Sequence, residues 1–279
     1  MPAPTTPLDV DALVSRHLDG VAVDAVSVWW GSPDGTTTYA RDAEVPHYAA
    51  STMKLPLVVA AHRRHDRGEL DLDAPVEVHD AFASAYDGAT FSMRQEHDQD
   101  DETWDARGTS VPLRELARRA VVRSGNLATN LVLERTGTDE VAAVLRDAGC
   151  SPATVLPRGI EDAPAREAGL DNLVTAHDLG LVIGALVSGR LVGAGSAREL
   201  EAVLAAQEHD EQVPAGLPAG TYVAHKTGWV DGVAHDVALV RPADRAPYVL
   251  AVCSTADAPE QTLYDLNAAV SRAVWEAQR

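Results

Sequence analysis

The spacing of the apolar residues changes twice along this 279-residue chain, and this change limits the folds that it can adopt. Alternating apolar residues predict a hairpin over residues 21–39 and strands over residues 221–226, 236–240 and 248–253. Helical spacing predicts helices over residues 8–18, 51–65, 111–122, 127–134, 139–148, 175–188, 197–206 and 261–279. Strands therefore occur at both ends of the sequence, with helices between them.

This order predicts an α+β fold in which the N- and C-terminal strands share one antiparallel sheet. Helices flank the sheet, and an all-helical subdomain is inserted between its two halves. We expect residues 1–50 and 207–279 to form the α/β subdomain and residues 51–206 to form the helical subdomain. The active site is expected between the two.

The net charge of −19 argues against nucleic acid or an anionic membrane as a partner. No apolar run approaches a membrane span, and the N-terminal residues lack the apolar segment of a signal peptide. We therefore expect a cytoplasmic protein, or a secreted one if a signal has been removed. We also expect a monomer that binds a small-molecule substrate.

The two cysteines, Cys150 and Cys253, are compatible with two buried thiols or with one disulfide. No spacing of Cys and His residues is typical of a metal site, so we expect neither a metal nor a cofactor.

Lysine is almost absent from the chain, because only two of its 23 Lys and Arg residues are lysines. Lys54 ends a Ser-x-x-Lys motif that begins at Ser51, and Lys226 begins a Lys-Thr-Gly motif. A guanidinium stays charged at any working pH, whereas a buried ammonium can lose its proton and act as a base. We interpret Lys54 as a base for Ser51, which lies three residues earlier on the same helix face. A helix-capping serine followed by a solvated lysine would give the same pattern.

A Ser-Gly-Asn motif at residues 124–126 lies between these two motifs, at the boundary of two predicted helices. Alone it would indicate only a capping turn. In the third motif, Lys226 and Thr227 can hold a carboxylate, and Gly228 lets a substrate backbone approach closely.

The order SxxK, SxN, KTG resembles that of the penicillin-recognising serine hydrolases, which include class A β-lactamases and D-alanyl-D-alanine peptidases. The resemblance covers roughly residues 21–279. It implies the family's fold and hydrolysis of β-lactam amides through an acyl-serine intermediate. A D-alanyl-D-alanine peptidase or penicillin-binding protein, or a small esterase or amidase, is the alternative with the same chemistry. A non-catalytic ligand-binding protein on the same scaffold is the alternative from another class, and the intact motifs disfavour it.

The resemblance implies that Ser51 is acylated, that Lys54 helps to remove its proton, and that Ser124 passes a proton to the leaving nitrogen. Backbone N–H groups of Ser51 and Trp229 would form an oxyanion hole, in which one donor typically contributes about 3–4 kcal/mol. The resemblance also implies the substrate-binding residues. Asn126 would hydrogen-bond the substrate's side-chain amide.

The KTG motif, with Lys226, Thr227 and Gly228, would hold the substrate carboxylate.

In the β-lactamase branch, a glutamate in a Glu-x-x-x-Asn loop activates the water that releases the acyl group. Glu161 lies within a residue or two of that position, but Ala165 replaces the asparagine. Asn130 matches an asparagine that braces this loop in the family. We predict Glu161 as the deacylating base; as an ordinary loop acid it would leave the acyl-enzyme to turn over slowly.

Gly125 replaces the aspartate that braces the SxN motif in the family, so we expect a different support. Residues 82–108 form an insertion rich in acids, among them Asp98 and Asp100. We interpret this insertion as a solvated surface loop, with an acidic lid that favours cationic substrates as the alternative. A Ser/His/Asp site that uses His225 or His235 is a further alternative, but no GxSxG elbow supports it.

Overall fold

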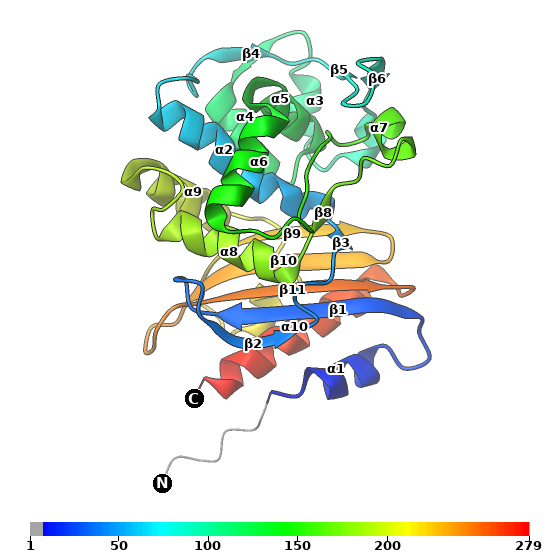
Figure 1. Cartoon of the computed structure of the whole chain (residues 1–279), viewed down its shortest axis with the longest axis vertical. Coiled ribbons are helices and arrows are strands. Elements are labelled where there is room, and N and C mark those ends of the chain that lie inside the picture. The colour runs from blue at the N-terminus through cyan, green and yellow to red at the C-terminus, as the bar shows by residue number, and fades with distance from the viewer. Residues whose placement is uncertain (1–7, 279) are drawn as a thin grey trace.

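A five-stranded antiparallel sheet joins the two ends of the chain and confirms the predicted α+β fold (Figure 1). The computed structural model describes residues 8–278. The strand order is β2-β1-β11-β10-β9, so the N-terminal hairpin pairs with the last C-terminal strand. The strands are β1 (Val23–Gly31), β2 (Thr37–Arg41), β9 (Tyr222–Val230), β10 (Val233–Arg241) and β11 (Tyr248–Ala256).

The hairpin of β9 and β10 is longer than the sequence predicts. Pairing continues to Val230 opposite Val233, and the turn between them is a tight one. Gly232 makes this turn possible because its φ of +74° lies in the left-handed region that favours glycine. The KTG motif therefore lies inside β9, where backbone pairing with β10 holds it in place.

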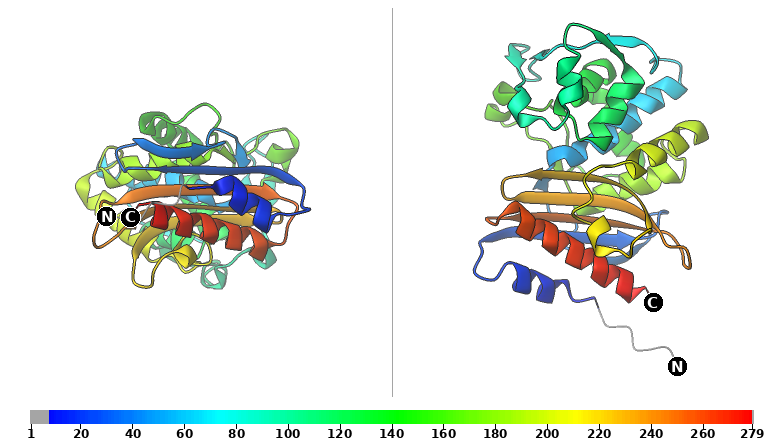
Figure 2. Two further views of the ribbon diagram at one scale, coloured as in Figure 1. Left: turned by 90° about the horizontal axis from the view of Figure 1, so that it is seen from below. Right: turned by 180° about the vertical axis from the view of Figure 1, so that it is seen from behind.

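Helices cover both faces of the sheet (Figure 2). α1 (Val10–His17) packs against α10 (Glu260–Ala277), which covers β10 and β11 on one face. On the other face, α8 (Ala176–Val187) packs against β1, β10 and β11, and α9 (Ala194–Ala205) packs against β9. Alternate residues of β11 serve the two cores, because successive side chains of a strand point to opposite faces.

Close packing on the α8 face depends on a glycine. A Cβ on Gly180 of α8 would lie 2.3 Å from the ring of Trp29 in β1, so only glycine lets the helix pass over this indole. Trp29 is almost completely buried. Truncating a buried aromatic residue of this kind typically costs about 3–5 kcal/mol.

The helical layer surrounds one buried helix, α2 (Lys54–Asp66), which follows the short 3-10 helix η1 (Ala50–Met53). Every residue of α2 from Lys54 to His62 is buried. A helix that is enclosed on all sides must be apolar all round, which explains the run from Leu55 to Ala61. The helices packed around it are α4 (Leu113–Val122), α5 (Asn126–Thr136), α6 (Thr138–Ala148), α8 and α9.

The remaining elements are short and lie mostly around the helical layer. They are β3 (His47–Tyr48), β4 (Pro75–Glu77), β5 (Ala81–Ala83), β6 (Thr90–Ser92), η2 (Gln95–His97), α3 (Asp101–Asp105), β7 (Ser110–Pro112), α7 (Ala163–Glu167), β8 (Leu173–Val174) and η3 (Pro214–Gly216). The subdomain boundaries stay a prediction. Two parts of these predictions lie outside the described residues: residues 1–7, where the α/β subdomain begins, and residue 279, where the last predicted helix ends.

Cys150 and Cys253 are both free thiols, so the two-thiol alternative is correct and the disulfide is not formed. Burial raises the pKa of both thiols above the usual value. Within residues 8–278, no helix has the length and apolarity that crossing a membrane requires.

Candidate active site

Ser51 lies in η1, directly before the buried helix α2, and β9 passes close beside it. A Cβ on Gly228 would lie 2.7 Å from the backbone nitrogen of Ser51 and 2.8 Å from that of Thr52. Contacts this short do not occur, so Gly228 is needed for the KTG strand to approach the backbone of Ser51. Ala50, directly before Ser51, has a φ of +44°, which is uncommon for a residue other than glycine and typical of functional sites.

Lys54 is completely buried, and its ammonium group points to the SxN motif. Its Nζ donates to the carbonyl oxygen of Ser124 at 2.6 Å, to Oδ1 of Asn126 at 2.8 Å and to Oγ of Ser124 at 3.3 Å. Burial lowers the pKa of Lys54 to about 7, against the opposing effect of Asp98 and Asp100. Near neutral pH, a large fraction of this amine is therefore neutral and able to accept a proton.

Lys226 approaches the same serine from the opposite side. Its Nζ donates to Oγ of Ser124 at 3.1 Å and to the carbonyl oxygen of Thr227 at 2.7 Å. Burial, and then the neighbouring charge of Lys54, hold the pKa of Lys226 well below its usual value. A bound carboxylate would reverse this effect, because an opposite charge favours the ammonium form.

The SxN motif is held by a carboxylate from the acidic insertion. Asp98 accepts hydrogen bonds from the backbone nitrogens of Asn126 and Leu127, each at 2.7 Å. Its Oδ2 also accepts from Nε1 of Trp104 at 2.8 Å. These backbone N–H groups begin α5, where helices leave donors unsatisfied and favour negative charge. Asp98 thus caps α5 from outside the helix and fixes the position of Asn126.

Gly125 has a packing reason that the sequence does not reveal. A Cβ at this position would lie 2.9 Å from Cβ of Asp100 and 3.1 Å from its Oδ2. Asp100 is only 1% exposed, and it accepts hydrogen bonds from Thr103 and from Arg123. The different support expected for this motif is therefore the pair of Asp98 and Asp100.

The prediction of a solvated loop is wrong for the central part of the insertion. Asp100 and Trp104 are buried there, and the acids make hydrogen bonds or ion pairs with the protein. The sequence signal that could have indicated burial was the group of acids from Asp98 to Glu102, which is followed by Trp104. Composition alone hid this role, because buried capping carboxylates and solvated ones look the same in a sequence.

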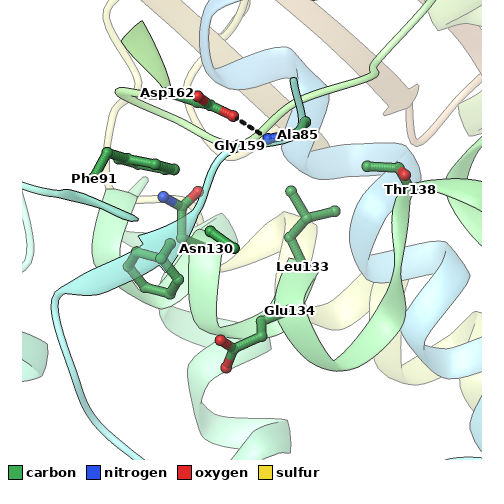
Figure 3. A pocket seen from close by; sticks show the side chains of 10 residues that line it. Ala85, Phe91, Asn130, Leu133, Glu134, Thr138, Gly159 and Asp162 are labelled. Atoms are coloured by element: carbon green, nitrogen blue, oxygen red, sulfur yellow. Dashed lines mark hydrogen bonds between the residues drawn. The ribbon is translucent and has the colours of Figure 1, made fainter. Parts of the chain in front are cut away.

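The loop after α6 is braced by Asn130, as the resemblance implied. Asn130 Nδ2 donates to the carbonyl oxygen of Ile160 at 2.9 Å, and its Oδ1 accepts from the Ile160 nitrogen at 2.8 Å. Arg158 and Asp171 close the loop with an ion pair of 2.8 Å. Asp162 ties the loop to the insertion by accepting from the Ala85 nitrogen at 2.8 Å (Figure 3).

The cavity drawn in Figure 3 measures about 250 Å³ and lies behind this loop, away from the motifs. Its walls are largely Phe82, Phe91 and Leu133. Ser51 instead lines another cavity of about 400 Å³, together with Asn126, Ile160 and Trp229. We call this second space the Ser51 cavity, and we assign the chemistry to it because it contains the nucleophile.

The Glu161 carboxylate contacts the acidic insertion. Its Oε2 accepts from the backbone nitrogen of Arg94 at 3.1 Å, and its Oε1 lies 3.3 Å from Nδ1 of His97. In the described part of the chain, no hydrogen bond joins this carboxylate to Ser51 or Lys54. Ile160, one residue earlier, lines the Ser51 cavity, whereas Glu161 does not. The catalytic role of Glu161 stays a prediction, and Ile160 is a site residue that sequence reasoning missed.

The histidines do not form a Ser/His/Asp site with Ser51. His225 is buried between Asp236 at 3.0 Å and Asp210 at 3.2 Å. His235 is also buried, and its Nε2 lies 2.9 Å from the carbonyl oxygen of Tyr48. Among residues 8–278, no cluster of His, Cys, Asp and Glu has the arrangement of a metal site.

The sequence matches the profile of the Beta-lactamase enzyme family (Beta-lactamase2) over residues 11–278. Two curated relatives are the beta-lactamase AST-1 of Nocardia asteroides, 36% identical over 151 residues, and a beta-lactamase of Kitasatospora aureofaciens, 36% identical over 149 residues. These alignments cover 53% and 50% of this chain. The chain spans about half the length of these relatives, 48% and 47%.

Solved structures give the same family over almost the whole chain. An ancestral class A beta-lactamase has a TM-score of 0.79 at 25% identity, covering 96% of this chain and all of that one. A beta-lactamase of Xanthomonas campestris has a TM-score of 0.82 at 22% identity, covering 97% of each chain. PBP-A has a TM-score of 0.77 at 21% identity, covering 99% of this chain and 98% of that one. The last two likenesses show the fold alone. With its fold, its three motifs in order and a profile match from residue 11 to residue 278, this chain belongs to the beta-lactamase enzyme family.

Proposed function

We propose that this protein is a serine hydrolase that opens β-lactam amides through an acyl-Ser51 intermediate. The observation that carries the proposal is the position of the Ser124 hydroxyl, which accepts hydrogen bonds from two buried lysines. Two buried lysines that share one hydroxyl are costly to keep charged, because burial disfavours the ammonium form. This arrangement of two lysines around one hydroxyl is suited to a site that transfers a proton and binds an anion.

In the acylation step, Ser51 Oγ attacks the amide carbonyl carbon while neutral Lys54 accepts the hydroxyl proton. The new bond joins Ser51 Oγ to the acyl carbon, and the bond that breaks joins this carbon to the amide nitrogen. Ser124 delivers a proton to that nitrogen, and Lys54, within hydrogen-bond distance of Ser124, replenishes it. The proton lost by the nucleophile thus reaches the leaving group.

Substrate binding rests on the KTG strand and on Asn126. Lys226 and Thr227 would hold the substrate carboxylate, and this charge would stabilise the ammonium form of Lys226. Asn126 would hydrogen-bond the side-chain amide of the substrate. The backbone nitrogens of Ser51 and Trp229 would stabilise the oxyanion, and the close approach of Gly228 to Ser51 supports this assignment.

We propose that release of the acyl group is the slow step. Water must attack the ester of Ser51, and a base must take one of its protons. Glu161 is the predicted base; its carboxylate contacts Arg94 and His97 and would act on the attacking water. We also retain as proposals that the enzyme acts as a monomer on small molecules and that it is cytoplasmic.

Intact-mass spectrometry with a penicillin, followed over time, tests the proposal. We expect a transient adduct on the wild type and none on Ser51→Ala. In the variant Glu161→Gln, a persistent adduct would establish Glu161 as the base, whereas an unchanged lifetime would exclude it.

The same experiment separates the alternatives. A stable adduct on the wild type would contradict β-lactam hydrolysis and favour a penicillin-binding protein. No adduct with any β-lactam or activated ester would favour a non-catalytic ligand-binding protein.

A further inference from the structure

The Ser51 cavity adjoins a second cavity of about 540 Å³, and the two share His97, Asn126 and Ile160 as lining residues. The second cavity also contains Arg94 and Arg166, and we call it the arginine cavity. It lies against the loop that follows α6 and against the acidic insertion. Apart from Glu161, the predicted deacylating base, none of its charged groups is used in the proposed catalytic steps.

The cations of the arginine cavity fall into two classes. Arg158 is almost completely buried, and its guanidinium is occupied by Asp171 and by the carbonyl oxygens of Leu170 and Gly159. Arg166 is exposed, and its guanidinium has no hydrogen bond or ion pair within residues 8–278.

The Arg94 side chain is 63% exposed, and its one partner is Glu96 at 3.4 Å. An exposed pair of this kind is weak and readily exchanged. Two guanidinium groups are therefore free to bind a ligand.

The acids of the same cavity are not available to a ligand in this way. Asp162 is buried and accepts hydrogen bonds from Ser84, Ala85 and Ala165. Glu161 is 18% exposed, and its carboxylate lies against the Arg94 nitrogen and His97. Glu161 Oε1 is buried without a hydrogen bond, so the exposed charged groups that a ligand can reach in this cavity are the guanidinium groups of Arg94 and Arg166, in a chain of net charge −19.

Two further carboxylates, Asp231 and Glu260, line the Ser51 cavity but not the arginine cavity. The carboxylates that line only the Ser51 cavity thus come from the β9–β10 turn and the start of α10, whereas the two exposed guanidinium groups come from the insertion and from α7. Asn126, the predicted partner of the substrate's side-chain amide, lines both cavities. A group attached next to that amide would extend toward the arginines.

We propose that the arginine cavity is a subsite for a carboxylate on the acyl side chain of the substrate, bound by Arg94 and Arg166. A guanidinium matches a carboxylate with two parallel hydrogen bonds, which a neutral side chain cannot form. The subsite gives the enzyme a preference for substrates that carry two negative charges, one for Lys226 and one for these arginines. This inference rests on the proposed function for the identity of the acyl group.

The test compares two penicillins that differ only by a carboxylate on the α-carbon of a phenylacetyl side chain. The acylation rate constant is measured for each by quench-flow and intact mass. We expect the ratio of the anionic to the neutral penicillin to fall up to about fivefold in Arg166→Gln and further in Arg94→Gln/Arg166→Gln, while the neutral rate changes less than about twofold. Arg272→Gln, an exposed arginine on α10, is the matched control and should keep the wild-type ratio. High salt should lower the ratio in the wild type and not in the double variant.

An unchanged ratio in the double variant would overturn the subsite while leaving the proposed function intact. If neither penicillin acylates Ser51, the proposed function fails and a binding measurement decides the subsite. Ligand-observed NMR then compares phenylmalonic acid monoamide with phenylacetamide. Preference for the anionic amide in the wild type, lost in the double variant, supports the subsite; equal binding of both amides overturns it.

Discussion

The two sides of Ser51 are built in different ways. On one side, Lys54 and Lys226 are completely buried and meet at Ser124, so their geometry is fixed by the core around them. On the other side, the loop containing Ile160 and Glu161 and the insertion containing Arg94 and His97 hold each other by polar contacts near the surface. In the proposed mechanism, the buried side serves acylation, and the exposed side sets release of the acyl group and substrate selection.

The fold therefore constrains the positions of the buried motif residues more strongly than those of the residues near the surface. A buried ammonium must be placed where the fold provides partners, so its position constrains many neighbours. A carboxylate near the surface can shift by one position along its loop and still find a hydrogen-bond donor. Changes on the buried side should therefore have larger effects on acylation than changes on the exposed side.

The two lysines should respond differently to a change that keeps their charge. Lys54→Arg should lower the acylation rate about 10³-fold, because a guanidinium cannot accept the Ser51 proton. Lys226→Arg should cost much less, since this residue needs only to hold charge. Quench-flow measurement of adduct formation compares them. Equal losses in the two variants would contradict the assignment of separate roles.

The pH dependence gives a second measure of the same base. Because Lys54 has a lowered pKa of about 7 and acts in its neutral form, acylation should rise with pH through about 7. Burial favours the neutral form of Lys54, and Asp98 and Asp100 oppose it. A rate that falls as pH rises through this range would exclude neutral Lys54 as the base.

Removal of the external cap of α5 should loosen the buried side. Asp98→Ala leaves two backbone N–H groups and the Trp104 indole without an acceptor, which should lower the free energy of unfolding by about 1–3 kcal/mol. Misplacement of Asn126 and Ser124 should slow acylation about 10- to 100-fold. Asp105→Asn, on the same segment and exposed, should leave both unchanged. Denaturant titration and adduct kinetics measure the two effects.

On the exposed side, a carboxylate placed in the Ser51 cavity should speed release of the acyl group. Ile160→Glu should shorten the lifetime of the penicillin adduct about tenfold, a modest gain for a base that is not yet aligned. Ile160→Gln, of the same shape without the charge, should not. If both variants have the same lifetime, the identity of residue 160 does not limit deacylation.

A buried charge behind the KTG strand should make stability depend on pH. Burial alone would lower the pKa of His225, but Asp236 and Asp210 raise it to about 9. The raised pKa means that this stabilisation, of about 3 kcal/mol, is complete below about pH 6.5 and is lost as pH rises through about 9. Thermal unfolding at pH 7 and pH 10 should show the loss, and it should be smaller in Asp236→Asn. The same loss in both proteins would show that His225 does not cause it.

Much of the fold followed from the sequence because period and order are local properties. The two-ended sheet and the helix at Ser51 could both be predicted from spacing, but the burial of that helix could not. The longer β9–β10 hairpin could not, because its pairing depends on a partner strand rather than on local pattern. The capping role of Asp98 and the packing of Asp100 against Gly125 were not predicted for a similar reason, because the residues that they contact lie on another element.

The sequence alone predicted Ser51 as the nucleophile, Lys54 as its base and the KTG strand as the carboxylate site, since rare residue types in a fixed order leave few alternatives. Which loop residue lines the Ser51 cavity depended on the tertiary structure. A shift of one residue, from Glu161 to Ile160, exchanges a carboxylate for a methyl-bearing side chain on the cavity wall. Sequence spacing does not resolve such a shift, because the direction of a loop side chain is set by the backbone contacts that Asn130 and Arg94 make across the fold.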